Sequence, residues 1–389
     1  MNTILKTRQI ITPIETIECG VIIWDQNGRI SFCGESQKAT HLDGKILEYQ
    51  SAIAVPGFID IHVHGGNGVE FGLGDVMPGL ITYAKWVARF GVTGFLLTIS
   101  GPSAEFIANA LRQYTPLLSQ EFDGAQPLGF HLEGPFLNPQ KHGAFNPDWL
   151  RQPTLEEMKT YLSIAGAWIR QVSLAPELPG AGDLARFLHK EKITVALAHS
   201  ATDYETAANA LNGDFTHVTH TFNAQSPFHH RKPGVVGAVL TSQSATAELI
   251  ADTVHVHPAA MRVLMKCVGV DRVVLITDAM PGAGLPDGDY SLLDQQVVVK
   301  HGRAYLPDGT IAGSTATMDI CVRNMVQEGC QPLSNTVKMA SFNPARVIGC
   351  EDQIGILTAG KQADITLLDQ DLRVLATLRD GKLVFEKAS

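Results

Sequence analysis

Two histidines, His62 and His64, stand one residue apart at the end of an apolar run in the stretch PGFIDIHVHGG. Residues i and i+2 of a strand point to the same side, so the two imidazoles are expected to lie together where the following glycines let the chain turn. Histidine is the commonest metal ligand in proteins. The spacing therefore predicts either a pair of metal ligands or two hydrogen-bonded histidines at a strand end.

Polar side chains of the same kind end other apolar runs along the chain. PLGFHLEGP contains Glu133, ITVALAHS contains His199, FTHVTH ends in His220, and RVVLITD ends in Asp278. A further run, AELIAD, ends in Asp252 and is followed by His255. If these runs are the strands of one barrel, their ends share the face on which active sites are built. The pattern favours a metal site over isolated structural histidines.

The donor set suits a divalent metal. Neutral imidazoles and a carboxylate bind Zn²⁺ or another first-row ion such as Fe²⁺. Glu133, His199 and His220 supply three ligands and leave a position open, and the His-x-His pair could complete a second site, so one or two ions per subunit are expected. A divalent metal lowers the pKa of its water from about 15.7 to about 7. Asp278 is either a ligand or the group that carries the proton to a leaving group, which predicts metal-assisted hydrolysis.

The middle of the chain contains eight apolar runs of strand length. They cover 51–63, 92–99, 127–132, 170–175, 193–198, 215–219, 246–251 and 272–277. Helix-like stretches at 77–90, 104–118, 154–165, 182–192, 204–211 and 258–268 separate most of them. This alternation predicts a parallel sheet covered by helices, and eight units fit a (β/α)8 barrel. A doubly wound open sheet is the competing architecture, weakened because no GxGxxG follows the first run.

Both ends of the chain differ from the middle. ECGVIIWD and RISFCGE flank Asn27-Gly28, and the C-terminal run RVLATLRDGKLVFE contains Asp380-Gly381; both dipeptides are hairpin signals. We therefore predict one discontinuous β domain, residues 1–53 plus 350–389, around a barrel of residues 54–349.

Composition excludes several classes of protein. The 389 residues are 45% apolar and carry a net charge of −9, which argues against a nucleic-acid or acidic-membrane partner. No run approaches the ~20 apolar residues of a membrane span, and the N-terminus has no signal-peptide pattern. The six cysteines are scattered without a CxxC pair. They are expected to be reduced, mostly buried thiols of a cytoplasmic protein.

A basic loop, HTFNAQSPFHHRKPGVVGA, follows the sixth run. Arg231 lies beside His229, His230 and Lys232, and a forked guanidinium beside imidazoles suits a phosphate or carboxylate. The alternative is a solvated basic loop. The nearness of Asn223 and Ala224 to a metal-ligand candidate favours anion binding.

The motifs HVHGG, HLEGPF, AHS, THTFNA, HHRKPGVVGA, ADTVHVHP, ITDAMPGAG, IAGST and GILTAGKQADITLLD together resemble the N-acetylglucosamine-6-phosphate deacetylases of the amidohydrolase superfamily. The resemblance covers nearly the whole chain in the same order. HHRKPG, VHVHPAAM and LITDAMPGAGLPDGDY look at least as much like the N-acetylgalactosamine-6-phosphate branch.

This resemblance implies a distorted (β/α)8 barrel with a small β-sandwich from both termini. It implies a cytoplasmic enzyme of amino-sugar catabolism that hydrolyses the acetamide of a 6-phosphorylated N-acetyl amino sugar to acetate and the free amine. Glu133, His199 and His220 take the metal-ligand roles, with His62 and His64 for a second ion, and Asp278 is general base and then acid. The implied substrate contacts are Ala144, Phe145, Asn223, Ala224, Arg231, His255, Ile311, Ala312, Gly313 and Ser314. Arg231 is expected to hold the phosphate of the neighbouring active site in a homodimer.

The chain departs from the family at one position. Some members carry a substrate-contacting histidine in the loop after EGP, and Phe145 stands there; His142 could substitute for it, and His230 is a further candidate contact. Two alternatives remain. Cyclic-amide hydrolases of the superfamily use a carboxylated lysine after the fourth strand, where this chain has Pro176-Glu177. A non-catalytic metal- or sugar-phosphate-binding sensor is disfavoured by Asp278 beside an open metal position.

Overall fold

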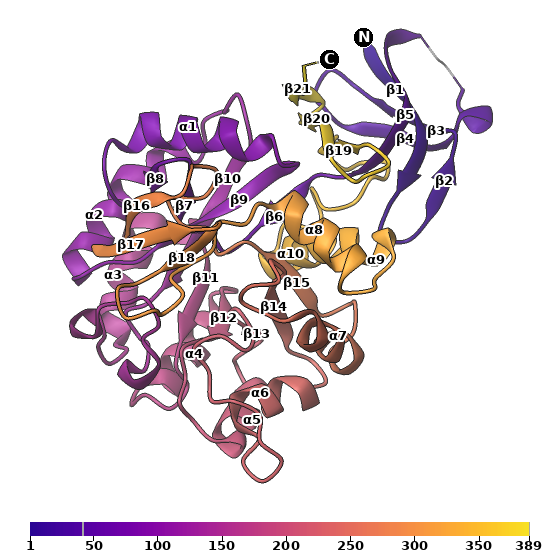
Figure 1. Cartoon of the computed structure of the whole chain (residues 1–389). Helices are drawn as coiled ribbons and strands as arrows, with labels where there is room; N and C mark the ends of the chain where they lie inside the picture. Colours follow the sequence, from indigo (N-terminus) through magenta and orange to yellow (C-terminus); the bar gives the residue numbers. More distant parts are fainter. Residues whose placement is uncertain (41–42, 389) are drawn as a thin grey trace.

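The centre of the molecule is a parallel barrel. The computed structural model describes residues 1–40 and 43–388; residues 41, 42 and 389 of the predicted terminal domain lie outside the described residues. Eight strands pair in the order β15-β14-β13-β12-β11-β10-β9-β6 (Figure 1). They are β6 (Phe58–Asp60), β9 (Val92–Ile99), β10 (Gln126–Glu133), β11 (Ile169–Leu174), β12 (Thr194–Leu197), β13 (His217–Val218), β14 (Thr246–Ile250) and β15 (Val273–Ile276).

Backbone hydrogen bonds just beyond the two end strands bring β6 and β15 together. The Asp278 N–H donates to the His62 carbonyl at 2.9 Å, and the His64 N–H donates to the Ala279 carbonyl at 2.9 Å. The Thr277 hydroxyl also donates to the Asp60 carboxylate at 2.5 Å. The predicted barrel is therefore confirmed, and its closure places the first and last strand ends side by side.

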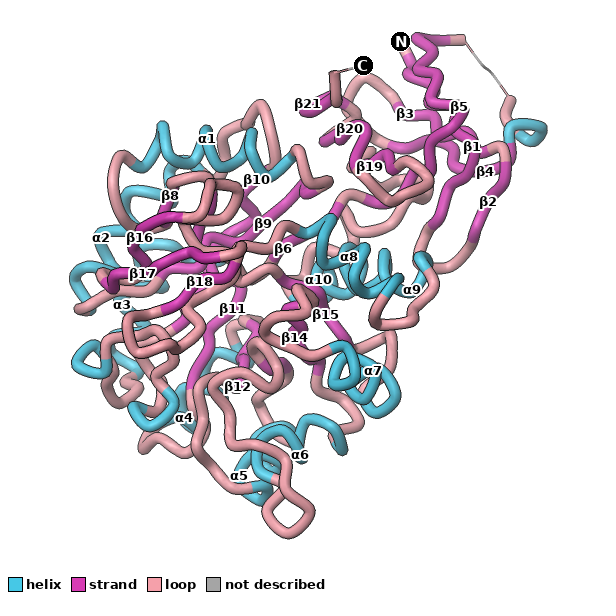
Figure 2. Tube along the Cα trace, in the orientation of Figure 1, coloured by secondary structure: helices cyan, strands magenta, loops and turns pink. Residues whose placement is uncertain are grey.

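Helices surround the sheet, as the tube in Figure 2 shows. They are α1 (Val76–Ala88), α2 (Ala104–Tyr114), α3 (Leu155–Ala165), α4 (Ala181–Lys190), α5 (Tyr204–Leu211), α6 (Gly234–Thr241), α7 (Pro258–Cys267), α8 (Met318–Gln327), α9 (Leu333–Val337) and α10 (Asn343–Val347). Ser103, Thr154 and Asp203 begin three of them, each accepting a backbone N–H three residues later. The outward faces of the strands and the inward faces of the helices form the largest apolar cluster.

The inside of the barrel contains a polar network. His131 Nε2 lies 2.7 Å from the Ser173 hydroxyl, which lies 2.8 Å from the Thr219 hydroxyl. All three side chains are fully buried. Buried polar groups need such partners, so this network fixes side chains from β10, β11 and β13 beneath the open end of the barrel.

Both termini contribute to one separate sheet, at the upper right of Figure 1. Its order is β21-β20-β19-β5-β1-β3-β4, with β2 beside β1. The strands are β1 (Asn2–Ile11), β2 (Thr16–Glu18), β3 (Gly20–Trp24), β4 (Ile30–Glu35), β5 (Gly44–Pro56), β19 (Ile365–Leu368), β20 (Val374–Arg379) and β21 (Lys382–Glu386). The predicted discontinuous β domain is confirmed as a sheet domain. The boundaries at 53/54 and 349/350 stay predictions.

The prediction of one strand over residues 51–63 is wrong. The run is divided between β5, which pairs with β19 as far as Pro56, and β6, which begins at Phe58. Gly57 joins them where a Cβ would come within 2.2 Å of the Thr93 hydroxyl. The chain therefore passes from the terminal sheet into the barrel at a close approach that requires glycine.

Two small antiparallel units follow the first and last barrel strands. β7 (Gly65–Gly66) pairs with β8 (Val69–Glu70) directly after His64. β16 (Gly288–Leu292), β17 (Gln295–Lys300) and β18 (Arg303–Tyr305) form a meander that lies across the front of the barrel in Figure 1. The sequence analysis did not predict the meander, which supplies part of the site described below.

The prediction that the cysteines are mostly buried is wrong. Cys321 is buried, Cys19, Cys267 and Cys330 are exposed, and the other two are half-buried; all six are free thiols. Cys267 and Cys330 lie at the end of α7 and in the turn after α8, at the surface, whereas the buried Cys321 lies within α8. Among the described residues, no helix combines the length and the apolar character needed to cross a membrane.

Candidate metal centre and active site

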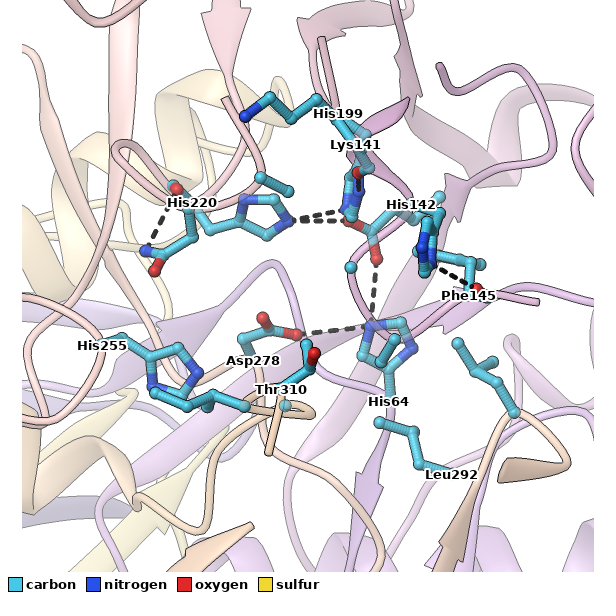
Figure 3. A pocket seen from close by; sticks show the side chains of 18 of the residues that line it. His64, Lys141, His142, Phe145, His199, His220, His255, Asp278, Leu292 and Thr310 are labelled. Carbon is cyan, nitrogen blue, oxygen red and sulfur yellow. Dashed lines mark hydrogen bonds and ion pairs between the residues drawn. The ribbon is translucent and has the colours of Figure 1, made fainter. Parts of the chain in front are cut away.

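The carboxyl ends of the barrel strands bring the predicted ligands together. Glu133 is the last residue of β10, and His199, His220 and Asp278 each follow a strand by two residues. These side chains, with His64, line a cavity of about 420 Å³ (Figure 3). Each is more than nine-tenths buried. The strand-end pattern in the sequence thus corresponds to one site.

Glu133 lies between two pairs of histidines. Its Oε1 is 3.2 Å from His199 Nε2 and 3.1 Å from His220 Nε2. Its Oε2 is 3.1 Å from His62 Nε2 and 3.0 Å from His64 Nε2. One carboxylate oxygen of Glu133 therefore faces each pair of histidines.

Asp278 completes the second group. Its Oδ1 is 3.3 Å from His64 Nε2 and 3.5 Å from His62 Nε2. Two sets of donors, His62 with His64 and Asp278, and Glu133 with His199 and His220, each lie within 4.8 Å of one another. The chain therefore offers two groups that could each hold a metal ion.

Three of the site residues have an uncommon backbone conformation. φ is +42° at His199, +25° at His220 and +50° at Asp278. Positive φ is unfavourable for residues other than glycine and persists where the surroundings hold it. The Asn138 N–H donates to the His199 carbonyl at 3.0 Å, and Ser314 N–H donates to the Asp278 carbonyl at 2.7 Å. These bonds hold the turns that direct the side chains into the cavity.

Burial and opposite charge act against each other in this cluster. Burial lowers the pKa of His62, but Glu133, Glu248 and Asp278 outweigh it and raise the pKa of His62 well above its usual value. Burial likewise lowers the pKa of His64, but Asp278 and Glu133 bring it to about 9. Burial raises the pKa of Glu133, yet His62 and the other histidines hold it well below its usual range. Without a metal, protons supply the positive charge that the carboxylates require.

The residues present fit a divalent cation. His199 Nδ1 lies 2.6 Å from the Lys141 carbonyl, which can only accept, so Nδ1 carries the proton and Nε2 of the neutral ring presents a lone pair. Burial lowers the pKa of His199, which favours that neutral form. Nε2 faces Glu133 Oε1 and lies 3.1 Å from His220 Nε2. Converging lone pairs of this kind are what a metal ion satisfies.

Glu248, in β14, was missed by the sequence analysis. Its Oε2 lies 2.8 Å from His62 Nδ1 and accepts the His220 backbone N–H at 2.9 Å. Its Oε1 accepts from Gln171 and lies 3.0 Å from His217 Nε2. A single buried carboxylate thus orients one histidine from each pair. The sequence feature that could have identified Glu248 is a charged residue inside the otherwise apolar run AELIAD.

Replacing Glu248 by glutamine is expected to weaken metal binding by about 10–100-fold, because carboxylates that orient ligating histidines typically contribute that much. Glutamine keeps the size of the side chain but removes the charge that holds the His62 Nδ1–H. Chelator competition on the purified variant measures the effect. Asp364→Asn is the control, because Asp364 is a buried carboxylate that accepts the Asp380 N–H at 2.8 Å rather than contacting a candidate metal ligand. Unchanged metal affinity in the Glu248→Gln variant would show that Glu248 does not support metal binding by orienting the histidines.

The other predicted residues divide into three groups. His142, Ala144, Phe145, Asn223, Ala224, His255, Ile311 and Gly313 line the cavity. Ala312 and Ser314 are buried beside it, while His230 and Arg231 are exposed and lie outside its lining. The structure therefore places most of the predicted sugar contacts beside the candidate metal ligands. The basic loop that contains Arg231 does not line the cavity of the same chain.

Two cavity histidines have defined partners. His142 Nδ1 lies 3.0 Å from the Phe145 carbonyl, and His255 Nδ1 lies 2.7 Å from Asp252 Oδ2. Asp252 therefore orients His255 rather than facing the cavity itself. Gly143, next to His142, has φ +59° and approaches His199 so closely that a Cβ would lie 3.0 Å from its ring.

A barrel whose open end carries two groups of donors that could hold metal ions is suited to a metal-dependent hydrolase. The chain belongs to the amidohydrolase family, which matches residues 53–384. An N-acetylglucosamine-6-phosphate deacetylase of Vibrio furnissii is 37% identical over 370 residues, covering 95% of this chain and 92% of that protein. An N-acetylgalactosamine-6-phosphate deacetylase of Escherichia coli O157:H7 is 38% identical over 339 residues, covering 87% and 89%.

A solved structure of a deacetylase also resembles this chain over nearly its whole length. The Mycobacterium smegmatis N-acetyl-D-glucosamine-6-phosphate deacetylase, in a mutant form in complex with N-acetyl-D-glucosamine-6-phosphate, superposes with a TM-score of 0.91. It is 31% identical, and the match covers 98% of this chain and 99% of that one. The resemblance identified from the motifs is thereby confirmed.

Proposed function

We propose that this chain hydrolyses the acetamide of N-acetylglucosamine-6-phosphate, releasing acetate and glucosamine-6-phosphate. The observation that carries the proposal is Glu133 between two histidine pairs with Asp278 beside them, all facing one cavity. Relatives named as N-acetylglucosamine-6-phosphate deacetylases match nearly the whole chain. N-acetylgalactosamine-6-phosphate is the second candidate, because a relative with that activity is equally similar.

Glu133, His199 and His220 would hold one divalent ion, Zn²⁺ in the first place with Fe²⁺ as the alternative, and His62, His64 and Asp278 would hold a second. When bound, a divalent metal would supply Lewis-acid chemistry at the acetamide carbonyl and would lower the pKa of water in the site. Glu248 and the Lys141 carbonyl orient the rings.

Asp278 moves the proton. Burial raises the pKa of this carboxyl, but His62 and His64 outweigh burial and hold the pKa below its usual value. It takes a proton from the attacking water and passes it to the amine nitrogen as the C–N bond breaks. One water is consumed, and one carboxylate and one amine leave the site.

Substrate recognition is divided between the cavity and a neighbouring subunit. Asn223, Ala224 and His255 would contact the sugar, and His142 would take the place of the family histidine that Phe145 replaces. Arg231 is exposed and outside its own cavity, which supports a homodimer in which it binds the phosphate of the partner's substrate. Six free thiols support the predicted cytoplasmic location.

Replacing Arg231 by alanine is expected to raise KM for the phosphorylated sugar by roughly 10- to 100-fold, because a hydrogen bond to a charged group contributes about 1.5–3 kcal/mol. kcat is expected to change little, since the side chain is remote from the reacting atoms. Steady-state kinetics measure both. Lys232→Ala is the control within the same loop, and an Arg231 variant with wild-type KM would rule out the phosphate role.

A cyclic-amide hydrolase is disfavoured by the end of β11. Glu177 follows that strand and accepts hydrogen bonds from Asn138, Ser200 and the Ala201 N–H, so it holds loops together. Acetate release from the gluco and galacto substrates, each with and without phosphate, tests the proposal. Equal rates on the phosphorylated and plain sugars would overturn the phosphate specificity.

A further inference from the structure

The cavity has one apolar side. Leu292 and Leu293, at the tip of the β16–β17 hairpin, line it together with Phe145. The three side chains are 2%, 7% and 5% exposed and belong to one apolar cluster. Figure 3 shows Phe145 and Leu292 on the side of His64, whereas His220 and His255 lie on the other side. The cavity therefore has an apolar wall on the side of His64.

A second cavity lies behind this apolar side. Its volume is about 200 Å³, and Phe71, Leu73, Pro102, Phe106 and Trp149 contribute apolar surface to it. Leu293 lines both cavities, so its side chain stands between the reaction site and an apolar space beside it.

The backbone of Leu293 has a conformation that is unfavourable for leucine. Leu292 pairs with Gln295, so Leu293 and Asp294 form a two-residue turn, with φ of +51° and +62°. Such turns prefer Asn-Gly, because both residues have positive φ. The Leu293 N–H donates to Glu70 Oε1 at 2.7 Å, which fastens the hairpin to β8, the segment that follows His64. A bulky residue held in this conformation at a cavity wall indicates that its side chain has a role.

We propose that Leu293, with Leu292 and Phe145, forms the binding wall for the acyl group, and that the cavity behind Leu293 is a latent subsite for longer acyl chains. The inference rests on the proposed function. With the carbonyl at the metal ligands and the sugar toward His255, the acyl methyl faces Leu292 and Phe145. A closed apolar wall accepts a methyl group and excludes additional methylenes.

The test compares N-acetyl, N-propionyl and N-butyryl glucosamine-6-phosphate in the wild type, Leu293→Ala and Leu293→Gly. Hydrolysis of each consumes one water and breaks the same C–N bond, releasing the corresponding carboxylate. We expect the butyryl-to-acetyl ratio of kcat/KM to rise about 10-fold or more in both variants, because one methylene is discriminated by about 10–200-fold in an apolar pocket. Glycine suits the positive φ, so Leu293→Gly keeps the hairpin foldable if alanine does not.

Val297→Ala is the matched control. Val297 is buried in the same hairpin and apolar cluster but lines neither cavity, so its loss should leave the ratio unchanged. Metal content should be equal in all variants. Unchanged ratios in an active Leu293→Gly protein, or an equal shift in Val297→Ala, would overturn the acyl-wall assignment alone. A wild type inactive on all three amides would overturn the proposed function and this inference with it.

Discussion

Replacing Asp278 by asparagine is expected to lower kcat by about 10²–10⁴-fold, the usual contribution of a positioned acid–base group. Asparagine keeps the shape of the side chain but cannot accept a proton from water or deliver one to the departing amine. The group formed by Glu133, His199 and His220 does not include Asp278, so at least one metal position should survive. Steady-state kinetics and metal analysis of the same sample measure both effects.

Asp308→Asn is the control for this substitution. Asp308 also lines the cavity, but its carboxylate accepts the Thr310 N–H at 2.9 Å and faces no metal ligand. Its variant should keep nearly full activity. If Asp278→Asn retained more than about a tenth of the wild-type kcat, Asp278 would not be the proton carrier.

Replacing Glu133 by glutamine is expected to remove more activity than any other single change. Its two oxygens face different histidine pairs, so an amide in their place leaves one pair opposite an NH₂ group. The metal contributes several kcal/mol of transition-state stabilisation, so its loss should lower kcat/KM by more than roughly 10³-fold. Metal analysis should show at least one ion fewer than in the wild type.

Glu177→Gln provides the comparison for Glu133→Gln. Glu177 follows the neighbouring strand β11 and bonds to loop residues, so its variant should lose stability but no metal. A Glu133→Gln protein with full metal content and activity would contradict the shared-ligand geometry.

The ligands could be predicted from the sequence because each stands at the end of an apolar run. The rule that the ends of parallel strands meet on one face of the barrel is enough to predict that four of them lie together: Glu133, His199, His220 and Asp278. His62 and His64 lie beyond the end of β6 at Asp60, so strand periodicity does not explain their pairing, although both Nε2 atoms lie near the same oxygen of Glu133 as the sequence predicted. Local patterns thus predict which side chains meet at the candidate metal centre.

Glu248 could not be assigned in the same way. Its bond to His62 joins residues 186 positions apart, and it exists only because the barrel brings β14 and β6 around one interior. Leu293 is a similar case, because the sequence predicts neither its turn conformation nor its position in the lining of two cavities. Contacts that form only when the barrel closes, or when a distant hairpin packs against it, cannot be predicted from local sequence patterns and become apparent only in the three-dimensional structure.

Acetate release from N-acetylglucosamine-6-phosphate by chelator-stripped protein, during titration with Zn²⁺, tests the central claim most directly. We expect no turnover without metal and recovery that saturates at one or two ions per chain, the stoichiometry being read from metal analysis of the same samples. Stripped protein that releases acetate at the undiminished rate would contradict a metal-dependent deacetylase built on Glu133, His199 and His220.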